Sequence, residues 1–93
     1  MDEQLRVVLD QAVAVLKSAG AREIYVFGSA AGGTLREHSD LDLAVSGLPP
    51  ERFFKALGGA MMAAKCPIDL IDLDEESPFG EYLKTHGKLQ RVA

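Results

Sequence analysis

The chain alternates between two spacings of hydrophobic residues, and each spacing predicts one kind of secondary structure. Near its start they recur every three or four positions, as on one helical face: Leu5, Val8, Leu9, Ala12, Val13 and Leu16. This pattern predicts a helix over about 3–18, with Asp2 as its N-cap and Gly20 as its stop. A similar stripe predicts a helix over about 50–64. An acidic entry before Pro78 and a stop at Gly87 predict another over about 78–86.

Three short apolar runs predict strands between these helices, and the first of them is rich in β-branched and aromatic residues. The runs cover about 22–27, 41–46 and 67–73, while the tail over 88–93 is either a short strand or a frayed end. A helical turn over 29–31 would add a fourth helix. The resulting order predicts an α+β fold, an α/β sandwich with a three-stranded mixed sheet and about four helices.

Length, charge and composition narrow the classes of protein. The 93 residues suffice for one small domain, which we expect to span 1–93. The net charge of −4 argues against strong nucleic-acid binding, because such binders carry a basic face. The single cysteine, Cys66, cannot form an intrachain disulfide. No apolar stretch approaches the roughly 20 residues of a membrane span, and the acidic start does not resemble a signal peptide. We therefore expect a soluble cytoplasmic protein with no membrane contact.

Acidic residues stand at the starts of two predicted strands, where carboxylates are unfavourable unless a function requires them. Asp40 and Asp42 begin the second strand and Asp69 begins the third, while Gly28-Ser29 ends the first. If the first two strands are antiparallel and the helix-linked second and third are parallel, all these residues meet at one sheet edge. Close carboxylates repel one another, and Mg²⁺, which prefers carboxylate and phosphate oxygens, relieves that repulsion. The pattern therefore predicts a magnesium–nucleotide site.

The same residues carry a family resemblance. Gly28-Ser29, ten intervening residues, Asp40-Leu41-Asp42 and the later Asp69 resemble the signature of minimal nucleotidyltransferases (MNT) of the polymerase-beta superfamily. Within that superfamily the chain is similar to MntA-like antitoxins of HEPN/MNT toxin–antitoxin systems. The resemblance covers essentially the whole chain and implies the nucleotidyltransferase fold. It implies that Gly28 and Ser29 bind the triphosphate of ATP. It also implies that Asp40 and Asp42 hold two Mg²⁺ ions, and that Asp69 completes a metal site and helps to activate the acceptor.

The activity that this resemblance implies is the transfer of AMP from Mg-ATP to a hydroxyl of a partner protein. In such prokaryotic, cytoplasmic systems the partner is an all-helical HEPN ribonuclease toxin, and the modified group is a tyrosine. The antitoxin silences the toxin by this reaction. The sequence itself does not identify the acceptor, the preferred nucleotide or the oligomeric state.

Two alternatives remain open at the level of sequence. Ala30 and Ala31 stand where such proteins often carry Arg or Lys, which favours a non-catalytic antitoxin that neutralises its partner by contact. A third possibility is a domain that modifies a small hydroxylated molecule. The helix over 50–64 and the patch of Phe79, Tyr82 and Leu83 are the predicted interfaces.

Overall fold

The computed structural model describes residues 3–28 and 40–93. Its helices are α1 (Glu3–Ser18), the short 3-10 helix η2 (Pro50–Arg52), α2 (Phe53–Ala64) and α3 (Pro78–His86). Its strands are β1 (Glu23–Val26), β2 (Leu41–Ser46), β3 (Ile68–Asp72) and β4 (Gln90–Arg91). The α+β class and the three longer helices are confirmed, although the predicted helix over 50–64 begins with a 3-10 turn. The predicted Asp2 cap and the turn over 29–31 lie outside the described residues.

Within the described residues the sheet contains four strands, where the sequence predicted three. Their order is β3-β2-β1-β4, with β2 parallel to β3 and β1 antiparallel to both β2 and β4. The tail is thus a strand: Val92 N donates to Ile24 O at 2.9 Å, and Ile24 N donates to Ala93 O at 3.1 Å. This strand was uncertain from sequence because two paired residues show no hydrophobic alternation.

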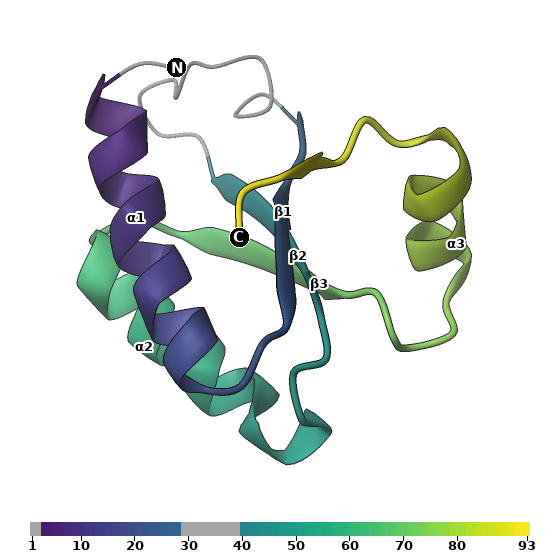
Figure 1. Cartoon of the computed structure of the whole chain (residues 1–93), viewed down its shortest axis with the longest axis horizontal. Coiled ribbons are helices and arrows are strands. Elements are labelled where there is room, and N and C mark those ends of the chain that lie inside the picture. The colour runs from purple at the N-terminus through teal and green to yellow at the C-terminus, as the bar shows by residue number, and fades with distance from the viewer. Residues whose placement is uncertain (1–2, 29–39) are drawn as a thin grey trace.

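One face of the sheet is covered by α1 and α2, which lie side by side, while α3 stands on the other side of the sheet (Figure 1). Alternate residues of β2 point into the larger core, and Leu41, Leu43 and Val45 are fully buried there. The opposite face holds a smaller core of Phe27, Ala44, Leu73 and Leu83. Leu83 is therefore a core residue, and its predicted place in an interface patch with Phe79 and Tyr82 is wrong. No described helix is long and apolar enough to cross a membrane.

The ends and packing of α2 and α3 follow local chemistry. Gly80 N donates to the Ser77 hydroxyl at 3.0 Å, so Ser77 caps the start of α3. In α2, a Cβ added to Gly59 would lie 3.1 Å from Val15 Cγ1 on α1. Gly59 therefore permits the two helices to pack closely. The neighbouring Gly58 has no atom within 4 Å of an added Cβ, so the fold of the described chain does not require a glycine there.

Candidate active site

The strand directions bring the predicted acidic residues to one edge of the sheet. Because β2 and β3 are parallel, Asp42 lies directly opposite Asp69 in the register. Asp40 precedes the first residue of β2, and Gly28 follows the antiparallel β1. The Phe27 amide, next to Gly28, donates to Asp42 O at 3.1 Å, which ties the end of β1 to this position. The predicted antiparallel and parallel pairings are both confirmed.

The three carboxylates differ in their exposure to solvent. Asp42 is half-buried, whereas Asp40 and Asp69 are exposed. Side chains alternate along a strand, so Asp42 shares its face with Ala44, which belongs to the smaller core. The acidic edge therefore borders the sheet face on the α3 side, and the helices α1 and α2 cover the other face.

Electrostatic repulsion links these carboxylates. Burial raises the pKa of the Asp42 carboxyl, and the negative charges of Asp69 and then Asp40 raise it further. A proton or a cation at this position lowers the repulsion. The site thus has the electrostatic character of a cation site, with Asp42 at its centre.

Gly28 is required by both its backbone and its surroundings. Its φ is +69°, a conformation that favours glycine. An added Cβ would overlap the Asp42 carboxylate, with Asp42 Cγ at 3.1 Å. The absence of a side chain therefore permits the Asp42 carboxylate to lie directly against the Gly28 backbone. Ser29, the other predicted nucleotide-binding residue, lies outside the described residues.

The carboxylates at this edge are ligands that magnesium prefers, although they do not form a complete metal site by themselves. Within 3–28 and 40–93, no group of three or more His, Cys, Asp or Glu side chains is arranged to hold a metal ion. Mg²⁺ in nucleotide sites commonly takes only one or two carboxylates, with water and substrate phosphate oxygens as its other ligands. Asp42 and Asp69, paired across adjacent strands, supply two such carboxylates.

Comparison with known proteins identifies the family. The model of the family "Polymerase beta, Nucleotidyltransferase" matches residues 11–89. The chain belongs to this nucleotidyltransferase family. The resemblance that the sequence signature indicated is thereby confirmed, and the observed sheet agrees with the nucleotidyltransferase fold. No curated protein sequence matches the chain.

Solved structures similar to this nucleotidyltransferase chain include MNT toxin–antitoxin proteins. A protein described as a minimal nucleotidyltransferase is 26% identical with a TM-score of 0.72, and the match covers 94% of both chains. A toxin–antitoxin crystal structure with AMP-PNP is 27% identical with a TM-score of 0.68, and covers 86% of this chain and 69% of the other. In a Shewanella oneidensis complex of a tri-AMPylated HEPN toxin with an MNT antitoxin, the matched chain is 22% identical. Its TM-score is 0.64, with coverage of 91% and 70%, and this likeness shows the fold alone.

A second group of acidic residues in this nucleotidyltransferase lies at the opposite edge of the sheet. Asp72 accepts a hydrogen bond from Asp74 N at 2.9 Å. Asp74 in turn accepts from Ser46 Oγ at 3.0 Å and from Gly47 N at 2.6 Å. These bonds fix the turn after β3 to the end of β2. Asp72 and Asp74 therefore belong to an ordered turn.

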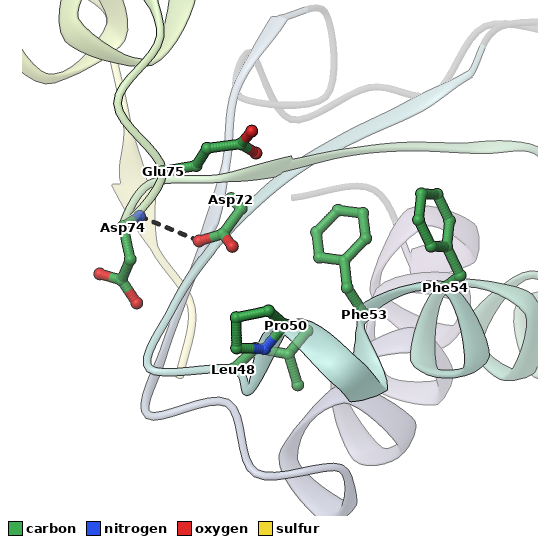
Figure 2. Close-up of a pocket in the computed structure, with 7 residues that line it drawn as sticks. All are labelled: Leu48, Pro50, Phe53, Phe54, Asp72, Asp74 and Glu75. Carbon is green, nitrogen blue, oxygen red and sulfur yellow. Dashed lines mark hydrogen bonds between the residues drawn. The ribbon is translucent and has the colours of Figure 1, made fainter.

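This turn borders a pocket that the sequence did not predict, here called the acidic pocket. Figure 2 shows two phenylalanines on one side and three acidic residues on the other. The pocket has a volume of about 530 Å³ and is lined by Leu48, Pro50, Phe53, Phe54, Asp72, Asp74 and Glu75. The only signal in the sequence is the aromatic pair next to a proline turn, which by itself fits a buried helix start equally well.

Proposed function

We propose that this chain transfers AMP from Mg-ATP to a hydroxyl, the phenol of a tyrosine, on a HEPN-type toxin, and thereby acts as its antitoxin. The observation that carries the proposal is the register pair of Asp42 and Asp69 beside the side-chain-free Gly28, in a chain of the nucleotidyltransferase family. Two adjacent carboxylates beside a glycine turn supply oxygen ligands of the kind that a magnesium-bound triphosphate needs.

The residues have separate roles in this proposal. Gly28 and Ser29 receive the triphosphate, since backbone without a bulky side chain permits close approach of phosphate. Asp40, Asp42 and Asp69 would hold two Mg²⁺ ions, which supply charge neutralisation at the phosphates and lower the pKa of a bound hydroxyl. Asp69 also accepts the proton of the acceptor hydroxyl. The acceptor oxygen bonds to the α-phosphorus, the bond from that phosphorus to the β-phosphate oxygen breaks, and pyrophosphate leaves.

The partner and the nucleotide are proposed from relatives. Two toxin–antitoxin structures, one with AMP-PNP and one an MntA-HpeT variant, each contain a chain 27% identical to this one. AMP-PNP is an ATP analogue, so this relative supports an adenine nucleotide. The sequence resemblance to MNT antitoxins supports a HEPN-type toxin as the acceptor. In the Shewanella complex, the HEPN toxin bound to an MNT antitoxin carries AMP groups. The similarity of the matched chain to this one extends to the fold only.

Intact mass spectrometry of the partner tests the proposal directly. The purified chain is incubated with Mg-ATP and the HEPN-type toxin, and we expect the toxin to gain the mass of one AMP group per modified hydroxyl. Asp42→Asn should abolish the gain. Asp10→Asn, an equivalent change of an exposed aspartate on α1, should leave it unaffected.

Toxin neutralisation in cells separates this reading from the contact-only antitoxin. If the Asp42→Asn variant still neutralises the toxin and no AMP is transferred by the wild type, the chain acts by binding alone. If AMP transfer is absent but small hydroxylated molecules are modified, the acceptor class in the proposal is wrong.

A further inference from the structure

The outer face of α2 is unusually apolar for a helix at the surface. Lys55 is the only charged residue in its 12 residues, and Phe54 and Met62 are each 81% exposed. Helices at the surface ordinarily turn charged side chains to water. Large exposed apolar side chains that lie together mark interaction surfaces. Phe54, Gly58 and Met62 follow one another at intervals of four residues, so they form one line along the helix, here called the α2 ridge.

Gly58 gives the ridge a notch. An added Cβ at this position would meet no atom within 4 Å, so the described fold gains nothing from a glycine there. Glycine inside a helix lowers its stability relative to alanine. A glycine that lowers helix stability and that packing within the described chain does not require is consistent with a contact to another molecule. Between two protruding side chains, a glycine permits another backbone to approach α2 closely.

The ridge leads at its N-terminal end into the acidic pocket. Phe54 belongs to both the ridge and the pocket (Figure 2). Its ring packs edge to face on that of Phe53, with 5.4 Å between the ring centroids and an interplanar angle of 87°. Across the pocket, Glu75 is exposed, and its carboxylate has no hydrogen-bond or ion-pair partner in the described part of the chain. Aromatic faces and an unpaired carboxylate both favour a cation, so the pocket suits a Lys or Arg side chain.

We propose that the α2 ridge and the acidic pocket together bind an amphipathic helix of the partner protein. Its apolar side would lie on the ridge, its backbone would cross α2 at Gly58, and a Lys or Arg at one end would occupy the pocket. Charge argues against a second copy of this chain as the occupant, because the chain carries a net charge of −4 and the pocket is already acidic. The proposal rests on the proposed function for the identity of the partner as the HEPN-type toxin.

The position of the ridge connects it to the acidic edge. After Ala64, the chain passes directly into β3, whose second residue is Asp69. A helix seated along α2 therefore runs from the acidic pocket at one edge of the sheet toward the proposed catalytic edge at the other. The Asp42 carboxylate shares its face with Ala44 on the α3 side of the sheet, so docking along α2 would leave that carboxylate accessible.

Calorimetry with the purified HEPN-type toxin tests this surface. We expect Phe54→Asp and Met62→Asp each to weaken the complex by at least about tenfold, since truncation of central apolar anchors has effects of this size. Glu75→Lys should weaken it severalfold and reduce its salt dependence. The matched control is Val7→Asp, which places the same charge at a 55% exposed valine of α1, and it should stay within about twofold of the wild type. Circular dichroism verifies that each variant folds.

The outcomes distinguish the docking surface from the proposed function. All four variants should bind Mg-ATP as the wild type does, because none of them lies at the acidic edge. Three results would overturn the docking surface alone. They are wild-type affinity for the toxin in both ridge variants, an equal loss of affinity in Val7→Asp, and the absence of a toxin complex from a wild type that binds Mg-ATP. A wild-type dimer in sedimentation equilibrium that Phe54→Asp dissociates would assign the ridge to a second copy and also overturn it. Failure of the wild type to bind Mg-ATP would count against the proposed function, while the toxin affinities would still decide the surface.

Discussion

At the scale of a single residue, the Asp42 carboxylate is unfavourable for folding but suited to binding a cation. Its carboxylate is half-buried, lies opposite Asp69 and is repelled by Asp40, and its pKa is raised by burial first and by these two charges second. Such a group is unfavourable for folding at neutral pH. A site that binds a cation would tolerate that cost, because the bound ion removes the repulsion.

The raised pKa predicts a specific dependence of stability on pH. In the folded state Asp42 holds its proton above the ordinary value of 3.8, so the folded chain binds more protons than the unfolded chain in that range. The favourable contribution of Asp42 to the free energy of unfolding is present below pH 3.8. It is lost as the pH rises through the higher pKa of the folded state. Urea unfolding in EDTA should therefore show wild type losing stability relative to Asp42→Asn as pH rises toward 7. A difference between the two that does not vary with pH would contradict this explanation.

Gly28→Ala should damage both folding and the site. The φ of +69° and the overlap with the Asp42 carboxylate predict a loss of about 1–3 kcal/mol in the free energy of unfolding, with loss of Mg-ATP binding. Gly20→Ala is the control, because Gly20 also has a positive φ, +115°, but lies near Pro49 at the other end of β1. It should lower stability and leave Mg-ATP affinity unchanged in the folded fraction. Equal effects of both variants on affinity would remove the special role of Gly28.

At the scale of elements, Gly58 and Gly59 in α2 allow the effect of helix propensity on stability to be measured separately from the effect of packing against α1. Gly58→Ala should raise the free energy of unfolding by about 0.5–1 kcal/mol, since nothing opposes the new methyl group. Gly59→Ala should gain less or lose stability, because its Cβ would lie 3.1 Å from Val15 Cγ1. Chemical denaturation of the isolated chain measures both. A larger gain at Gly59 than at Gly58 would show that the α1–α2 packing is looser than described.

The elements themselves were largely predictable from hydrophobic spacing. The long amphipathic α1 and the apolar runs of β1 to β3 carry strong local patterns, and the structure confirms them. Long-range pairing decides what could not be predicted. β4 has only two paired residues and exists because the tail returns to Ile24. Leu83 looked like part of an interface patch because the small core on the α3 side, which buries it, is made of residues far apart in the sequence.

The candidate site was predictable for a related reason. The placement of Asp42 and Asp69 at one edge of the sheet follows from strand directions, which the connections between the strands indicate. Their direct pairing in the register was not predicted. Side-chain detail did not follow from the sequence. The proximity of Gly28 to the Asp42 carboxylate and the ordered turn at Asp72 and Asp74 depend on the local path of the backbone. The acidic pocket was missed because its aromatic and acidic sides come from different elements.

At the scale of the whole molecule, the two edges of one small sheet carry different chemistry. One edge gathers the carboxylates of β2 and β3, and the other holds the acidic pocket, with α2 running between them on one face (Figure 1). Such a division would let a partner contact the length of α2 while the carboxylates on the α3 side of the sheet stay accessible. The proposed catalysis and the proposed docking can therefore be disrupted independently, by changes at Asp42 and at Phe54.

Titration of the purified chain with ATP by calorimetry, with and without Mg²⁺ and beside Asp42→Asn, tests the central claim most directly. The account predicts binding that requires Mg²⁺, that Asp42→Asn abolishes and that Asp10→Asn preserves. It also predicts that the affinity falls on acidification, because a proton on Asp42 competes with the cation. Binding that is indifferent to Mg²⁺ or survives Asp42→Asn would contradict the proposed site. No binding by the chain alone or in complex with its toxin would contradict the nucleotidyltransferase activity itself.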